Sequence, residues 1–448
     1  MVLQRLAFLT DFIEAITRRK RGGDAEALKA LARPPLERVT VAASVLMGRI
    51  GDASRVAVAE QALWAYRALD MTEKHRLFAH LRDNYGADDE SIRTAYTAWE
   101  NDPHAANLAT LFRAVEPARQ TLLRRLNLAP GATLQLVRMR EDLLVAIRDD
   151  PALAPVDQDF AHLLASWFNR GFLTMRRIDW NSPAAILEKI MAYESVHPMQ
   201  GWDDLKRRLA EADRRIYGFF HPATGDEPLI FVEVAFVKGI PDAIAPILNA
   251  PEAANAPTAD TAAFYSINNS LPGLKGVSFG NFLIKQVVSV LLAERPDIRK
   301  FVTLSPVPGF ARWLSAQTDA PSIALAESLA GSDWHNDPDA QARLRPAVEA
   351  MAARYIVVAR NPRGQPPDPV ARFHLGNGAS AHQLNWPADL SSRAIRSAHG
   401  LMVNYLYELP EIEHRHEAFV RDGHVAHGAQ LAAALERHGN GESIADHP

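Results

Sequence analysis

The sequence predicts an α+β protein in which an all-helical N-terminal domain precedes a domain built around a β-sheet. Apolar residues recur with the helical period up to about residue 175, as at Leu3, Leu6 and Leu9. After about residue 210 the pattern becomes the alternation that is typical of strands. A strand, a glycine loop, a helix and a second strand then follow within residues 263–314.

Two domains are expected because 448 residues are too many for one small core. We set the helical domain at 1–175, where apolar faces without any cluster of reactive side chains suggest a role in oligomer assembly. The sheet domain, at 176–438, carries the candidate chemistry. The last residues, 439–448, are expected to be disordered.

The composition is that of an ordinary globular protein, with 48% apolar and 23% charged residues. The formal net charge of −4 argues against binding to nucleic acid or to an anionic membrane. No apolar run approaches the ~18 residues of a membrane-spanning helix. An anionic ligand would therefore be held by a local group of donors rather than by the field of the whole protein.

The sequence contains no cysteine, which excludes disulfides, thiolate metal sites and a cysteine nucleophile. This absence fits a reducing compartment, and we expect the protein to be cytoplasmic. The amphipathic stretch 3–19 carries Asp11 and Glu14, which disfavour a mitochondrial presequence.

The alternating stretches 215–220 and 229–237 are joined by a turn rich in proline and glycine, which predicts a hairpin. Glu233 lies in the middle of the second stretch, among apolar residues. It is either on a solvated face or a buried acid with a partner, and the solvated face is the preferred interpretation.

The glycine loop after the strand at 263–269 predicts a site for an anion. Gly273, Gly276 and Gly280 permit turns that expose backbone amides, and Asn281 stands where the next helix should begin. Free amides at a helix N-terminus bind phosphate groups. The glycine spacing matches neither the P-loop nor the dinucleotide fingerprint, so a plain tight turn is the alternative.

The second strand, at 300–305, favours a ligand site. Pro306 and Pro308 are expected to stop the pairing of this strand and to leave Ser305 at its last position. Strand ends beside a helix N-terminus are where α/β sheets place their ligands.

The histidines give no metal-ligand signature. His374 stands just before a Gly-Asn-Gly turn, where a lone histidine is usually structural. Several more histidines lie within 413–438, which we interpret as a helix with a solvated face. We therefore expect no metal site.

Several further blocks follow one another in order between about residues 167 and 407. They are Val196-His197-Pro198, Phe264-Tyr265-Ser266-Ile267, Gly276-Val277 with Gly280 and Phe282-Leu283-Ile284-Lys285, Leu304-Ser305-Pro306-Val307-Pro308-Gly309-Phe310, Phe373-His374-Leu375 with Asn377-Gly378-Ala379, Asn385-Trp386 with Ala388-Asp389, and Gly400-Leu401-Met402 with Asn404-Tyr405 and Tyr407. In this order and spacing the chain resembles the malonyl-CoA decarboxylase family over more than half of its length.

The resemblance implies a catalytic domain of the GNAT acyltransferase fold with a central mixed sheet, whose strand–loop–helix unit holds the pyrophosphate of coenzyme A. It implies that Ser305 accepts and His374 donates a proton, and that Ser266 and Tyr407 line the site. The loop residues implied in binding malonyl-CoA are Lys275, Gly276, Val277, Ser278, Phe279, Gly280 and Asn281. Some members carry a glutamate where this chain has Ser278, so no role of that acid carries over.

The implied reaction converts malonyl-CoA into acetyl-CoA and CO2. The electrons left by CO2 move into the thioester carbonyl, so donors must face the developing enolate oxygen. A histidine that titrates near neutrality suits the protonation of the α-carbon. Because the thioester is the electron sink, no metal, pyridoxal phosphate or biotin is expected. Lys275, Lys285 or Arg312 would neutralise the phosphates of coenzyme A.

The expected partners are malonyl-CoA and acetyl-CoA, and the expected assembly is a homo-oligomer, a dimer or tetramer. Two other functions fit the same binding unit. The chain could be an acyl-CoA N-acyltransferase with Tyr407 as its general acid, or a non-catalytic CoA-binding regulator whose helical domain contacts a partner. The presence of both Ser305 and His374 favours decarboxylation over either alternative.

Overall fold

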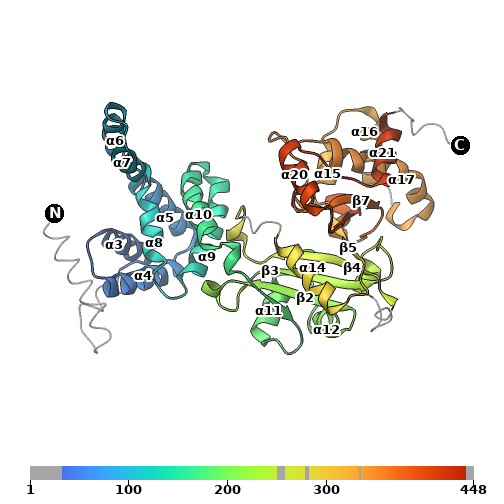
Figure 1. Ribbon diagram of the computed structural model, residues 1–448, viewed down its shortest axis with the longest axis horizontal. Coiled ribbons are helices and arrows are strands. Elements are labelled where there is room, and N and C mark those ends of the chain that lie inside the picture. The colour runs from blue at the N-terminus through green and yellow to red at the C-terminus, as the bar shows by residue number, and fades with distance from the viewer. Residues whose placement is uncertain (1–32, 250–257, 278–281, 332–333, 440–448) are drawn as a thin grey trace. The chain divides into compact units, whose positions relative to one another are not determined.

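The computed structural model describes residues 33–249, 258–277, 282–331 and 334–439, and these divide into two compact units (Figure 1). The first unit comprises residues up to 173 together with two later segments, 221–226 and 271–278. The second unit comprises 174–220, 227–270 and the chain from 279 onward. The amphipathic stretch 3–19 and the tail 440–448 lie outside the described residues.

The first unit is helical. Its helices are α3 (Pro35–Met47), α4 (Asp52–Arg67), α5 (Met71–Asn84), α6 (Asp89–Asn101), α7 (Ala105–Val115), α8 (Ala118–Leu126), α9 (Ala132–Asp149) and α10 (Ala154–Trp167). Short 3₁₀ turns complete it at η2 (Pro151–Leu153), η3 (Arg170–Phe172), η4 (Pro222–Thr224) and η6 (Pro272–Leu274). The predicted helical N-terminal region is confirmed.

The helices of the first unit form where capping and apolar periodicity agree. Asp70 and Glu73 make a reciprocal capping box that satisfies free amides at the start of α5. Phe78 of α5, Leu143 of α9 and Phe160 of α10 meet in one core and are almost fully buried. None of the helices that the structure describes is long and apolar enough to cross a membrane.

The second unit is organised around a mixed β-sheet. Its strands are β1 (Thr174–Ile178), β2 (Arg214–Phe220), β3 (Pro228–Val237), β4 (Thr261–Asn269), β5 (Lys300–Thr303), β6 (Ser305–Pro306), β7 (Ser380–Asn385) and β8 (Met402–Leu406). The order is β1-β2-β3-β4-β5-β8-β6, with β7 also paired to β8. The β4–β5 pair is parallel and the other described pairs are antiparallel. The α+β class and the β2–β3 hairpin are therefore confirmed.

Helices surround this sheet. They are α11 (Ala184–Tyr193), α12 (Trp202–Ala210), α13 (Ala245–Leu248), α14 (Phe282–Glu294), α15 (Phe310–Ser315), α16 (Ala320–Gly331), α17 (Pro338–Ala353), α18 (Pro369–Gly376), α19 (Ser392–Ala398), α20 (Ile412–Asp422) and α21 (Ala429–Gly439). A short 3₁₀ turn, η7 (Trp334–Asn336), precedes α17, and a π-helical turn, η8 (Arg354–Val358), continues it.

Helices α11 and α12 cover one face of the sheet and α14 covers the other (Figure 1). Ile190 of α11 and Leu205 of α12 pack in one buried cluster with Ile216 of β2. The next residue of β2, Tyr217, points to the opposite face because side chains alternate along a strand. Its hydroxyl lies 3.1 Å from a carboxylate oxygen of Glu294, the last residue of α14.

A β-bulge in β4 determines where Ser266 points. Glu233 of β3 pairs with Ser266, whereas the next residue, Val234, pairs with Phe264, so Tyr265 is the extra residue. Directly paired residues share a face, and consecutive residues take opposite faces. Ser266 therefore shares with Glu233 the face that α11 covers, and Phe264 does not.

The pairing of β4 with β5 ends at Phe264 and Thr303, followed by one bond of 3.0 Å from the Leu304 amide to the Phe264 carbonyl. Beyond this point β4 continues along β3, while Ser305 pairs with β8. Two parallel strands thus part at their carboxyl ends, the usual place for a ligand in an α/β sheet. The expectation that Pro306 would already stop pairing is wrong, because Pro306 pairs with Met402 as the second residue of β6.

Candidate active site

Ser305, His374 and Tyr407 form a continuous line of hydrogen-bonding groups. The Oγ of Ser305 lies 3.1 Å from Nε2 of His374, and Nδ1 of His374 lies 2.9 Å from the hydroxyl of Tyr407. All three side chains are buried. The structure therefore brings together three of the four residues predicted for the chemistry.

Local structure fixes the position of His374. Asp368 caps α18 by accepting the amides of Val370 and Ala371 at 2.8 and 2.9 Å, and His374 follows in the last turn of this short helix. The ring of Tyr405 stacks on the imidazole with centroids 4.7 Å apart. Stacking and two ring hydrogen bonds leave the imidazole little freedom to rotate.

Burial makes the protonated form of His374 unfavourable. Desolvation lowers the pKa of His374 to about 3, and it raises the pKa of Tyr407 well above its usual 10. In the free protein the imidazole is neutral at neutral pH. The expectation of a histidine titrating near neutrality is therefore wrong for the protein without its ligand, because it did not account for complete burial.

A neutral imidazole carries one N–H, so the hydrogens can be arranged in two ways. Tyr407 can donate to Nδ1 while Nε2–H donates to Ser305, or Ser305 can donate to Nε2 while Nδ1–H donates to Tyr407. Ser305 is also 2.8 Å from the Oγ1 of Thr303, which can accept its hydrogen in the first arrangement. Through the imidazole of His374 a proton can thus be transferred in either direction between Ser305 and Tyr407.

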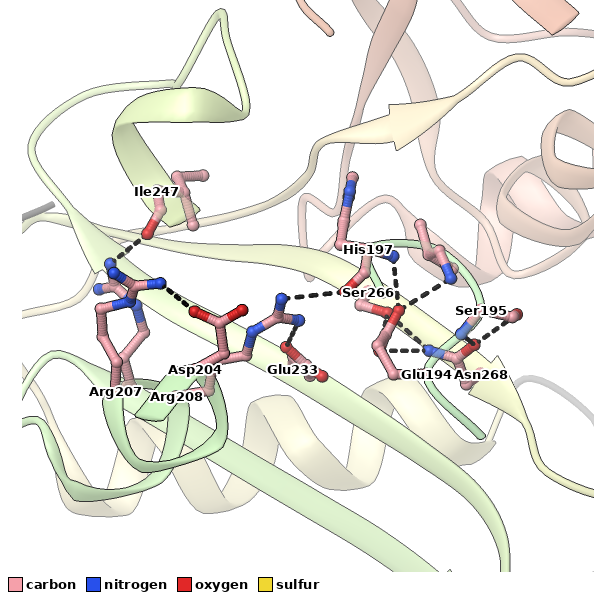
Figure 2. A network of polar contacts seen from close by, with 12 residues as sticks. Glu194, Ser195, His197, Asp204, Arg207, Arg208, Glu233, Ile247, Ser266 and Asn268 are labelled. Carbon is pink, nitrogen blue, oxygen red and sulfur yellow. Dashed lines mark hydrogen bonds and ion pairs between the residues drawn. The ribbon is translucent and has the colours of Figure 1, made fainter. Parts of the chain in front are cut away.

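Ser266, the fourth predicted residue, belongs to a second buried polar group, which we call the Glu194 cluster: Glu194, Ser195, Ser266 and Asn268 (Figure 2). Glu194 follows the last residue of α11, and its Oε2 lies 2.8 Å from Ser266 Oγ and 2.7 Å from Asn268 Nδ2. Its Oε1 accepts two backbone amides, those of Val196 and His197, at 2.8 and 2.6 Å.

Among the described residues no cationic side chain forms an ion pair with Glu194. Burial first, and then the charge of nearby Glu233, raises the pKa of Glu194 to about 9, so its carboxyl is protonated at neutral pH. Glu233 itself is fully buried and pairs with Arg208 at 3.1 Å. Placing Glu233 on a solvated face is therefore wrong. Its partner comes from α12, which is distant in sequence.

The described part of the predicted anion loop is held by the first unit. A Cβ on Gly273 would lie 2.0 Å from the carbonyl oxygen of Val137, so only glycine permits this approach to α9. Gly276 has a φ of +82°, which also favours glycine. Arg140 of α9, a residue that the sequence analysis missed, donates to the carbonyls of Gly273 and Lys275 at 2.8 and 2.9 Å.

The other predicted binding residues fall into four groups: exposed, buried, ion-paired, and outside the described residues. Lys275 and Arg312 are exposed, and Val277 is buried. Lys285 forms an ion pair with Glu413 of α20, so its ammonium has a partner within the protein. The predicted loop residues Ser278, Phe279, Gly280 and Asn281 lie outside the described residues. Across the described ranges no group of histidine and acidic side chains is arranged to hold a metal ion.

The residues missed from sequence left weak signals. Arg140 lies four residues after Leu136 and three before Leu143, a spacing that puts an arginine on the buried side of a helix. Asn268 lies two residues after the predicted Ser266 in β4 and so shares its face of the sheet. Glu194 gave no signal of its own, because its partners in β4 are more than 70 residues away in the chain.

The comparisons with known proteins agree along the chain. The model of the malonyl-CoA decarboxylase C-terminal domain matches residues 171–444, and that of the N-terminal domain matches residues 85–168. Among curated proteins, a mitochondrial malonyl-CoA decarboxylase from Anser anser anser is 34% identical over 354 residues, covering 72% of this chain and 70% of the relative.

Solved structures are more similar still. A crystal structure of malonyl-CoA decarboxylase from Rhodopseudomonas palustris is 49% identical with a TM-score of 0.85, and one from Agrobacterium vitis is 46% identical with a TM-score of 0.83. They cover 90% and 89% of this chain, and 99% of each of those chains is matched. Fold and relatives define a carboxy-lyase of α+β architecture. The chain belongs to the malonyl-CoA decarboxylase family.

Replacement of Glu194 by glutamine should stabilise the protein increasingly as pH rises. In the unfolded chain Glu194 ionises near its usual pKa of 4.5, whereas in the fold it stays protonated to about 9. Between these values the wild type loses about 1.4 kcal/mol of unfolding free energy per pH unit relative to Glu194→Gln, which cannot ionise. Below about pH 4.5 the difference no longer changes with pH. There Glu194→Gln should be the less stable protein, because its amide nitrogen cannot accept from Asn268 Nδ2. Urea unfolding at several pH values measures it, and parallel pH profiles for the two proteins would contradict a protonated Glu194.

Proposed function

We propose that this chain decarboxylates malonyl-CoA to acetyl-CoA and CO2, and that Ser305 and His374 perform the proton transfer. The observation that supports this most is the 3.1 Å contact between Ser305 Oγ and His374 Nε2 in a buried setting. Ser305 stands where β4 and β5 part, so a thioester entering between the strand ends would reach it.

The reaction has two parts. The bond between the α-carbon and the carboxylate breaks, CO2 leaves, and the electron pair forms an enolate with the thioester carbonyl. The α-carbon then takes up one proton to give acetyl-CoA. Hydrogen-bond donors held in a dry site stabilise the enolate oxygen more than water could.

His374 takes up a proton from solvent when the substrate binds. The free imidazole is neutral because it is buried. A malonyl carboxylate beside it adds a negative charge at short range, which raises the pKa of a histidine. The bound complex can therefore hold the proton that the α-carbon needs, directly or through Ser305. Tyr407 supports the imidazole through Nδ1.

Coenzyme A would bind along the loop that begins at Leu271. Lys275 is exposed and would contact the phosphates. Arg140 holds the loop backbone by donating to two of its carbonyl oxygens. The Arg140 charge is itself balanced by Asp157 at 2.7 Å. Arg140 is thus a support for the loop rather than a ligand of the phosphate.

Replacement of His374 by asparagine tests the proposed chemistry. Asparagine keeps a similar size and hydrogen bonding but cannot donate an acidic proton. Acetyl-CoA formation should fall by about 10²–10⁴-fold, while coenzyme A affinity stays near that of the wild type. Single-turnover CO2 release and calorimetric titration with coenzyme A measure the two quantities.

The matched control is His414→Asn, because His414 is largely exposed on α20. It should leave both quantities unchanged. Near-normal CO2 release per folded His374→Asn molecule would remove His374 from the mechanism. Acyl transfer to an amine that survives while CO2 release is lost would point to the N-acyltransferase alternative.

We also propose that turnover needs no metal ion or organic cofactor, since the thioester accepts the electron pair by itself. Activity should survive exhaustive treatment with EDTA followed by dialysis. Loss of CO2 release that one divalent metal restores would refute this.

A homo-oligomer, dimer or tetramer, is proposed from an apolar groove on the first unit. The groove is lined by Ile92, Tyr96, Leu108 and Phe112. Phe112 is 67% exposed. Exposed apolar grooves of this kind commonly bind another protein surface. Phe112→Glu should lower the mass measured by light scattering, whereas Val145→Glu, at an exposed site on α9, should not. A wild type that is monomeric at micromolar concentration would contradict the proposal.

We propose a cytoplasmic location, supported by the absence of cysteine. Immunoblots of separated cell fractions would decide, and recovery in an organelle fraction would overturn it.

A further inference from the structure

The Glu194 cluster contains one hydrogen whose position depends on protonation. Glu194 Oε1 is occupied by two backbone amides. The Asn268 amide donates to Glu194 Oε2 and to Ser266 Oγ, both at 2.7 Å, and its carbonyl oxygen accepts from the Ser195 amide and hydroxyl. The remaining contact is the 2.8 Å between Ser266 Oγ and Glu194 Oε2.

The two protonation states of Glu194 use this contact differently. An ionised carboxylate only accepts, so the hydroxyl of Ser266 must donate to it, and the charge makes this hydrogen bond strong. Ser266 then has only lone pairs to offer elsewhere. A protonated Glu194 is a weak acceptor and can itself donate, either to Ser266 or to the carboxylate of Glu233. The hydroxyl hydrogen of Ser266 is then released.

The surroundings favour the protonated state. The groups around Glu194 come from several elements: Glu233 of β3, Arg208 of α12, Tyr265 of β4, His197, and Arg393 of α19, which donates to the Ser195 carbonyl. Arg208 binds Glu233 and the His197 carbonyl, so its charge is already committed to them. The pKa of Glu194, raised to about 9 by burial, agrees with this geometry.

We propose that Glu194 is a positioning residue whose protonated form frees the Ser266 hydroxyl to donate a hydrogen bond to a negatively charged oxygen of the malonyl group. Ser266 stands two residues past the last β4–β5 pair, and Ser305 stands two residues past it on the neighbouring strand. An ionised Glu194 would withdraw that donor and set a second negative charge near the substrate. The inference rests on the proposed decarboxylation, which puts a malonyl group at these strand ends.

The test is the pH dependence of CO2 release by wild type, Glu194→Gln and Glu194→Ala from about pH 6 to about pH 10, a range that contains the titration of Glu194. Wild-type kcat/KM should fall as pH passes about 9, where Glu194 ionises. Glutamine is neutral like the protonated acid and keeps the acceptor for the two backbone amides, but its amide nitrogen cannot accept from Asn268 Nδ2. Glu194→Gln should stay within about threefold of wild type at neutral pH, and its activity should fall at a pH at least about one unit higher. Glu194→Ala leaves several buried donors unpaired and should lose about tenfold or more.

A second series asks whether Glu194 acts through Ser266. Ser266→Ala should lower turnover, and adding Glu194→Gln to it should not move the remaining alkaline fall. Melting temperatures of all variants show which proteins are folded. If Ser266→Ala lowers kcat and leaves KM unchanged, the oxygen that accepts from Ser266 is the enolate oxygen. If Ser266→Ala raises KM, that oxygen belongs to the malonyl carboxylate. Both results support the inference.

Three results would overturn the inference. They are an unchanged alkaline fall in Glu194→Gln, a folded Glu194→Gln as inactive as Glu194→Ala, and a full alkaline shift in the Ser266→Ala background. Absence of CO2 release from the wild type at every pH would instead refute the proposed function, so the two failures are distinguishable.

Discussion

The parting of β4 from β5 is the constraint on which the described site depends. Two parallel strands that stop pairing leave backbone groups that need other partners, since unpaired groups in a protein interior are costly. Here β3 continues to pair with β4 up to Asn269, and β8 pairs with Ser305 and Pro306. Pairing with β3 on one side and with β8 on the other therefore keeps the two strand ends separate. Ser266 lies on one side of this opening and Ser305 on the other.

Two buried polar groups lie near this opening: the Ser305, His374 and Tyr407 line and the Glu194 cluster. Each keeps its titratable side chain neutral by different contacts. Within the described part of the chain no carboxylate bonds His374, and the imidazole stays neutral between two hydroxyls. In the Glu194 cluster the acid accepts from backbone and side-chain amides, while the guanidinium of nearby Arg208 bonds Glu233 instead. Both Glu194 and His374 are neutral at neutral pH, so neither side chain adds a charge to the buried site.

Much of the architecture was readable from sequence because local signals agreed with it. The helical period of the first domain, the β2–β3 hairpin, and the strand–loop–helix–strand unit were all predicted by patterns within a few residues of each other. The pairing of Ser305 with His374 came only through family resemblance, since 69 residues separate them. Glu194, Arg140 and the partner of Glu233 were missed for the same physical reason. Their bonds join segments that only the folded chain brings together, and no short pattern records such contacts.

The membership of residues 271–278 in the helical unit has a consequence for how this protein can be divided. A boundary drawn near residue 174 separates two stretches of sequence but does not separate two self-sufficient structures, because Val137 and Arg140 shape and anchor a loop that belongs in sequence to the other part. A fragment that begins there would keep Ser305 and His374 yet lose the two residues that hold that loop. The loop therefore depends on the helical part of the chain for its conformation.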